Sequence, residues 1–253
     1  MKHYEKLIEL GCFSRQKLAE TLGSEPAAAS TIYEYLKKGY IERVRHDLYT
    51  VISLETKQPV LSRYQIGASL FPDACITHHS AFEVFGYANQ VFYETYVSTK
   101  SRFSDFVYNG VSYHRASPKK NAVTTMHGAV PVTSLEQTVV DSISDFEKIG
   151  GLEETLRCIA LIPALNSAKL LHVLKQYDNG FLYQKTGYLL QELSTSLTLP
   201  AAFFDECAKH VPSGKRYLTK EKTGLVFHER WKLYAPASIR SITDKGVNDY
   251  DAI

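Results

Sequence analysis

The pattern of apolar and polar residues predicts three short helices at the start of the chain. In each, apolar side chains recur every three or four residues, as on the buried face of an amphipathic helix. The first helix is expected over residues 2–10. Serines stand where the next two helices need an N-cap, and glycines stand where the first two should end. These boundary residues are Gly11, Ser14, Gly23 and Ser24.

A different pattern follows over residues 40–52. Apolar positions frame a turn that carries two arginines and a His-Asp pair, which predicts two short strands joined by a tight hairpin. Three helices followed by such a hairpin predict a winged helix-turn-helix over residues 1–55, a fold that often binds DNA. The apolar positions are Ile41, Val44, Leu48 and Val51.

Residues 53–60 lose this periodicity and contain a proline, so we expect a linker there and a second domain over residues 60–253. Runs of aromatic and β-branched residues in that domain predict a small, mostly antiparallel sheet. Helical periodicity dominates after Ser134, so the predicted class is α+β. The expected strands cover residues 91–98, 103–108, 111–115, 123–126 and 130–133, and later helices cover residues 152–162, 167–177, 182–193 and 201–210.

Composition narrows the possible functions. The chain has 253 residues and a formal net charge of only +2, so any surface for nucleic acid must be local. Its four cysteines lie dozens of residues apart, without the spacing of a zinc motif or a disulfide framework. No apolar run approaches the roughly 18 residues of a membrane span, and the N-terminus does not look like a targeting segment. We therefore expect a cytoplasmic protein that does not associate with membranes.

The predicted DNA-binding residues lie on the third helix and on the hairpin. Side chains near the start of that helix are short, and none is the Arg, Asn or Gln that makes bidentate contacts to bases. The basic residues are better suited to phosphates, where they add affinity and salt dependence. The alternative is that the module packs against a protein. The residues expected on DNA are Ser30, Thr31, Lys37, Lys38, Arg43, Arg45 and His46.

No constellation of residues predicts an active site. His78 and His79 are adjacent and should point to different sides of a helix, with only Glu83 at a ligand spacing, so we expect them to be structural. The Glu-x-Lys at Glu55 falls in the predicted linker, which argues against a metal-dependent nuclease. We found no phosphate-binding loop, kinase loop or nucleophile elbow. The prediction is a protein that is not an enzyme, with no cofactor and no metal.

Several motifs, taken in order, resemble the AbiEi family of antitoxins. The likeness spans about residues 1 to 195. The motifs are the basic-x-basic-x-x-Leu-Tyr of residues 43–49, Ile-Thr-His-His-Ser-Ala at 76–81 with Phe85-Gly86, Tyr-His-Arg-Ala at 113–116, the segment from Val130 to Asp141, and Gly-Gly-Leu-Glu-Glu at 150–154.

The resemblance implies a type IV toxin–antitoxin pair that acts in phage defence through abortive infection. The antitoxin would bind inverted repeats in its own promoter as a repressor. It would also neutralise a nucleotidyltransferase-like toxin encoded beside it, commonly without a stable complex. We expect a protein that can be monomeric in solution and bind its repeats cooperatively. An alternative is a winged-helix regulator whose larger domain senses a ligand or a protein partner.

Overall fold

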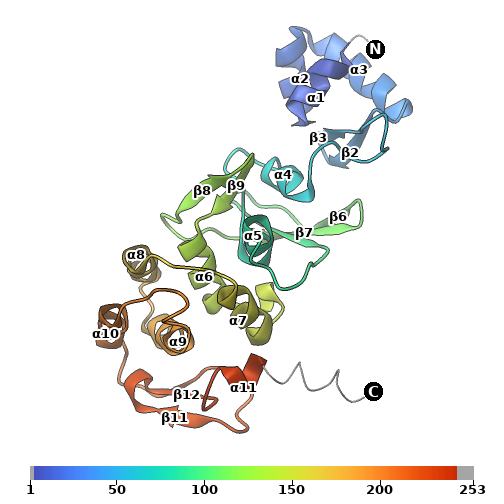
Figure 1. Cartoon of the computed structure of the whole chain (residues 1–253). Coiled ribbons are helices and arrows are strands. Elements are labelled where there is room, and N and C mark those ends of the chain that lie inside the picture. The colour runs from blue at the N-terminus through green and yellow to red at the C-terminus, as the bar shows by residue number, and fades with distance from the viewer. Residues whose placement is uncertain (1–2, 244–253) are drawn as a thin grey trace, which may run out of the picture. The chain divides into compact units, whose positions relative to one another are not determined.

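The computed structural model of the protein describes residues 3–243 and has an α+β fold, as the sequence predicts (Figure 1). Helices combine with small sheets in which most strand pairs are antiparallel. Within residues 3–243, no helix has both the length and the apolar character needed to cross a membrane. The chain divides into two compact units. Unit 1 comprises Met1–Ile76, Tyr93–Ala116 and Gly128–Pro131, and unit 2 comprises Thr77–Phe92, Ser117–His127 and Val132–Ile253.

Unit 1 begins with three helices and a three-stranded antiparallel sheet in the order β1-β3-β2. The Ser14 hydroxyl accepts a hydrogen bond from the Lys17 amide, and Ser24 accepts one from Ala27, so both predicted N-caps are confirmed. The elements are α1 (Tyr4–Leu10), β1 (Cys12–Phe13), α2 (Arg15–Leu22), α3 (Glu25–Lys37), β2 (Ile41–Arg45) and β3 (Leu48–Val51).

A small apolar core holds these elements together. Each of the three helices contributes side chains that are almost fully buried, and Ile41 and Val51 contribute from paired positions of β2 and β3. Asp47 has a φ of 52° in the hairpin turn, a conformation that Asp and Asn adopt more readily than most residues. The helix side chains in this core include Leu7, Leu18, Ala28 and Ile32.

Residues 53–60 form a closed loop that folds back on β3. Ile52 bridges Pro59, and the Val60 amide donates to the Val51 carbonyl at 2.9 Å. The Ser53 amide donates to the Gln58 carbonyl at 2.9 Å. Unit 1 continues beyond this loop to Ile76, whereas the sequence predicts a linker here.

The second part of unit 1 contains four strands of a six-stranded sheet, which are adjacent in the order β6-β7-β5-β4. Asn109 and Gly110 both have positive φ in the turn between β6 and β7, which confirms the predicted hairpin. β5 and β7 pair in parallel, unlike the other strand pairs of this part. The elements are α4 (Arg63–Ala68), β4 (Cys75–Ile76), β5 (Glu94–Ser98), β6 (Phe106–Tyr108) and β7 (Val111–Ala116).

Unit 2 is mainly helical, with one large apolar core. The Ser134 hydroxyl accepts from the Gln137 amide and caps α6, as the sequence predicts. β8 (Thr124–His127) and β9 (Val130–Thr133) precede that helix, and Val130 and Pro131 of β9 belong to unit 1. The helices are α5 (His78–Phe85), α6 (Leu135–Ser144), η1 (Phe146–Ile149), α7 (Leu152–Ala160), α8 (Ser167–Tyr177), α9 (Gly180–Gln191) and α10 (Ala201–Lys209).

A three-stranded sheet in the order β10-β12-β11 follows α10. Trp231 is buried next to it and donates from its indole nitrogen to the Gln191 amide oxygen at 2.7 Å. Its ring lies so close to Gly187 of α9 that no side chain fits there. The elements are β10 (Arg216–Tyr217), β11 (Val226–His228), η2 (Glu229–Trp231), β12 (Leu233–Ala235) and α11 (Arg240–Thr243).

Candidate functional site

The outer face of α3 carries polar and aromatic side chains that are open to solvent. Ser30, Tyr33 and Lys37 are exposed, at the three- and four-residue spacing that places side chains on one face of a helix. Tyr33 has 71% of its surface exposed, although its ring is largely apolar. An aromatic ring held in solvent beside a lysine is suited to contact a partner.

Thr31 lies on the opposite side of α3. Only 7% of its surface is exposed, and it belongs to the buried stripe that includes Ala28, Ile32 and Tyr35. The sequence assigns Thr31 to the solvent face and omits Tyr33, because Thr31 is polar at the edge of the apolar stripe and Tyr33 is a large aromatic residue. The structure turns the helix so that Thr31 faces the core and is poorly placed to reach DNA.

The β2–β3 hairpin presents further basic side chains. Arg43 and His46 are exposed, as are Lys37 and Lys38 near the end of α3. The Arg43 guanidinium lies 5.6 Å from the centre of the Tyr49 ring, which supports its extended position. Four of the basic residues predicted to contact DNA are therefore available at the surface of unit 1.

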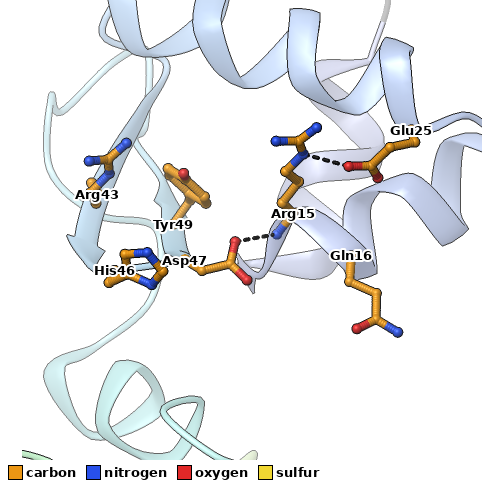
Figure 2. Close-up of a pocket in the computed structure, with 7 residues that line it drawn as sticks. All are labelled: Arg15, Gln16, Glu25, Arg43, His46, Asp47 and Tyr49. Atoms are coloured by element: carbon orange, nitrogen blue, oxygen red, sulfur yellow. Dashed lines mark hydrogen bonds and ion pairs between the residues drawn. The ribbon is translucent and has the colours of Figure 1, made fainter.

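A groove of about 620 Å³ separates this hairpin from the starts of α2 and α3 (Figure 2). Arg15 stands between two carboxylates: its Nε lies 2.6 Å from Glu25 Oε1, and its amide donates to Asp47 Oδ1 at 3.0 Å. The Arg15 side chain lies on the groove wall opposite Arg43, with Glu25 as its ion-pair partner. The complete lining is Arg15, Gln16, Glu25, Arg43, His46, Asp47 and Tyr49.

Arg45 has a different environment from Arg43. Its guanidinium carbon lies 5.2 Å, 5.6 Å and 5.8 Å from the ring centres of Phe71, Phe103 and Phe106. Its Nη1 is buried and makes no hydrogen bond. A guanidinium held among three rings gains from cation–π contact and from burial of its stem. This placement favours a packing role within unit 1 over the predicted contact with DNA.

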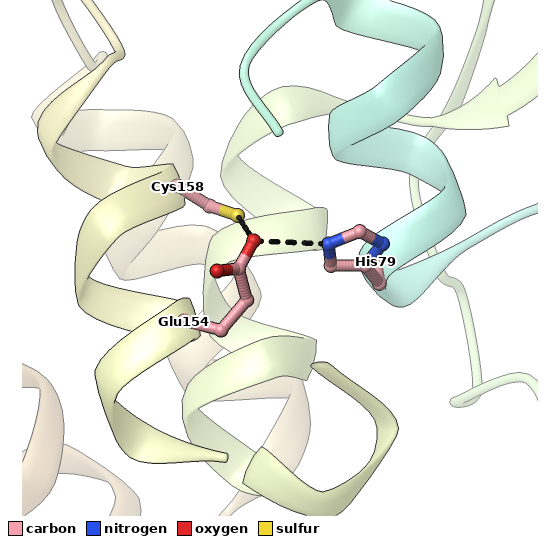
Figure 3. Close-up of side chains that lie close together, drawn as sticks. All are labelled: His79, Glu154 and Cys158. Carbon is pink, nitrogen blue, oxygen red and sulfur yellow. Dashed lines mark hydrogen bonds and ion pairs between the residues drawn. The ribbon is translucent and has the colours of Figure 1, made fainter. Parts of the chain in front are cut away.

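A buried polar network joins α5 to α7 in unit 2 (Figure 3). The Glu154 carboxylate lies 3.2 Å from His79 Nε2, and it accepts hydrogen bonds from Cys158, Asn89 and Gln90 at 3.3 Å, 3.1 Å and 3.0 Å. His79 and Glu154 are only 2% and 3% exposed. Burial, and the negative charge of Glu154, raise the pKa of the Cys158 thiol.

A second polar cluster lies around Asp141 of α6. Gln137 and the Tyr177 hydroxyl donate to Asp141 Oδ1 at 2.6 Å and 2.5 Å, and Thr77 donates to the same carboxylate. The Thr77 hydroxyl also lies 3.1 Å from His78 Nδ1. Burial raises the pKa of Asp141 to about 6 and lowers that of His78 to about 4. His78 has a φ of 54°, a left-handed conformation that is uncommon outside glycine but that histidine adopts more readily than most residues.

Neither a protein-family model nor a curated protein matches the chain.

The structure brings together residues that lie far apart in the sequence. His79 meets Glu154 across 75 positions, and Thr77 meets Asp141. The motifs that contain these residues are visible in the sequence, but their separation along the chain does not predict that the residues are in contact. The i, i+4 pair of Glu154 and Cys158 is a local signal that the sequence analysis missed.

Proposed function

We propose that the protein is a DNA-binding antitoxin that represses its own operon. The observation that carries the DNA-binding half is the exposed stripe of Ser30, Tyr33 and Lys37 on α3, in the same small fold as the exposed Arg43 of the hairpin. The element order α1-β1-α2-α3-β2-β3, with the sheet order β1-β3-β2, supports a winged helix-turn-helix.

In this proposal α3 enters the major groove and the hairpin follows the backbone. Ser30 and Tyr33 contact base edges or sugars, whereas Lys37 and Arg43 contact phosphates. Arg15 would also contact a phosphate, in place of its ion pair with Glu25. Arginine forms bidentate contacts with carboxylates and with phosphates, so the two anions can compete for the guanidinium. Carboxylates in the groove would discourage non-specific binding and favour one docked position.

The antitoxin half of the proposal is supported by the motif resemblance. The predicted partner is a nucleotidyltransferase-like toxin, and the motif residues that meet in unit 2 form buried networks rather than an exposed surface. Those networks are suited to holding unit 2 in one conformation. Neutralisation would then use surface residues of a well-ordered domain.

The test of DNA binding is a titration of the double variant Lys37→Ala, Arg43→Ala against duplex DNA that contains inverted repeats of the protein's own promoter. We expect affinity to fall by about ten- to a hundredfold, and the slope of log K against log salt to fall by about two, one for each lost phosphate contact. Fluorescence anisotropy over a range of salt concentrations measures both quantities.

The matched control is Lys209→Ala, which removes an exposed positive charge from unit 2. This variant should bind the operator with the affinity and salt slope of the wild type. Equal affinity of the double variant and the wild type would contradict the interface proposed for α3 and the hairpin.

A further inference from the structure

We propose that His79, Glu154 and Cys158 form a zinc-binding site in unit 2. Each offers one donor atom, and these three atoms all lie within 4.8 Å of one another (Figure 3). Two of the separations are 3.2 Å, from His79 Nε2 to Glu154 Oε1, and 3.3 Å, from that oxygen to Cys158 Sγ. Ligands that each lie 2.0–2.3 Å from a tetrahedral zinc ion are themselves separated by roughly these distances.

The donor set selects for zinc over the harder cations. Calcium and magnesium prefer oxygen ligands only, whereas zinc accepts imidazole nitrogen, carboxylate oxygen and thiolate sulfur together. Glu154 and Cys158 are one helical turn apart and project from the same face of α7. His79 comes from the first turn of α5. Two rigid helices, rather than mobile loops, therefore supply the ligands.

The surrounding residues hold these donors in the orientation that a metal needs. Glu83 Oε1 lies 3.5 Å from His79 Nδ1, the far ring nitrogen, and that oxygen accepts from the Phe92 amide at 2.9 Å. His79 Nδ1 is buried and makes no hydrogen bond among the described residues, whereas Nε2 faces Glu154 Oε1. Asn89 and Gln90 both donate to Glu154 Oε2, which leaves Oε1 directed at His79 and Cys158.

The burial of the network also suits a cation. The side chains of Glu83 and Glu154 are each only 3% exposed and lie on two sides of a single imidazole. Carboxylate oxygen, imidazole nitrogen and sulfur donors that converge inside the protein are ligands for a divalent ion, which would join α5 to α7. Three protein ligands would leave its fourth position for water.

The first experiment measures zinc in the full-length protein. The protein is treated with a chelator, supplied with one equivalent of zinc, desalted and analysed by mass spectrometry of the metal. We expect close to one zinc ion per chain. Cobalt in place of zinc should give a tetrahedral visible spectrum with a thiolate-to-cobalt charge-transfer band. Absence of retained metal, or a cobalt spectrum without the thiolate band, would overturn the proposal.

Variants identify the ligands. Cys158→Ser should lower zinc affinity by at least tenfold. Glu83→Gln, which removes a carboxylate 3.5 Å from His79 Nδ1 and keeps an acceptor for the Phe92 amide, should lower it by a smaller factor. Cys207→Ser is the matched control, because Cys207 is equally buried in unit 2 but lies outside this group. Equal affinity of the Cys158 and Cys207 variants would contradict the site. If Cys158→Ser fails to fold by circular dichroism, the wild-type cobalt spectrum still decides.

Discussion

Asp141 and His78 share one polar cluster but have opposite effects on how stability depends on pH. The pKa of Asp141 is raised from 3.8 to about 6, so its burial costs stability progressively as pH rises from about 4 to 6. The pKa of His78 is lowered from 6.5 to about 4, so its burial costs stability progressively as pH falls from about 6.5 to 4. In the wild type the two contributions partly cancel.

Single substitutions should separate the two effects. Asp141→Asn keeps the Oδ1 acceptor for Gln137 and Tyr177, and its new amide can donate to the Thr77 hydroxyl oxygen. The variant should therefore gain stability as pH rises from 4 to 6.5 and exceed the wild type by up to about 3 kcal/mol at pH 7. His78→Asn, which tolerates positive φ, should lose stability over the same range. Urea unfolding at pH 4.5 and 6.5 measures both. Parallel pH profiles of the two variants would contradict this assignment.

At the scale of single residues, the sequence predicted side-chain exposure only in part. Four predicted residues are exposed as expected: Lys37, Lys38, Arg43 and His46. Charged side chains on a short hairpin or at a helix end are seldom buried. Arg45 could not be placed in this way, since its aromatic neighbours come from segments 26 to 61 positions later. Its environment depends on tertiary packing rather than on the local pattern.

At the scale of secondary structure, α9 is shaped by the residue that packs against it. A Cβ at Gly187 would lie 2.1 Å from a ring carbon of Trp231. The indole is fixed by burial and by its hydrogen bond to Gln191, so it cannot move aside as a flexible side chain would. Glycine lowers helix propensity in the middle of a helix. It is nevertheless required at position 187, because the Trp231 ring occupies the place of a side chain.

We expect Gly187→Ala to destabilise the protein by about 1–3 kcal/mol, or more if the small sheet detaches from α9, although alanine is the better helix former. Thermal unfolding and the fluorescence of Trp231, which is the single tryptophan of the chain, report on this change. Gly214→Ala is the control, because nothing lies within 4 Å of its Cβ position, and it should change stability by less than about 0.5 kcal/mol. Equal stability of the two variants would contradict the packing argument.

Helix boundaries were the best predicted elements. Ser14, Ser24 and Ser134 act as N-caps, and each is visible as a local signal beside an amphipathic run. Strand pairing was predicted less well. The parallel pairing of β5 with β7 depends on the path of the chain between them, and no residue type marks it. The same holds for the network of His79 and Glu154, which come from α5 and α7, two helices that both pack on α6.

At the scale of the whole molecule, we expect the proposed DNA contacts and the proposed neutralisation of a toxin to use different surfaces. The double variant Lys37→Ala, Arg43→Ala changes exposed side chains of unit 1 only. We expect it to lose repression of its own promoter and still to rescue growth when co-expressed with the toxin encoded beside it. A promoter–reporter assay and a growth assay in the same cells measure the two activities. Loss of both, with normal protein levels, would contradict this separation.

The division into units has a consequence for synthesis of the protein. The chain passes from one unit to the other five times, and unit 1 receives its last residues only at Pro131. At roughly 5–20 residues per second, a ribosome needs several seconds to travel from Ile76 to that point. During this interval the nascent chain holds the first 76 residues without the strands that complete their unit. Cleavage of the mRNA before the codon for residue 131, or a ribosome that stalls there, would therefore yield a fragment in which neither unit is complete.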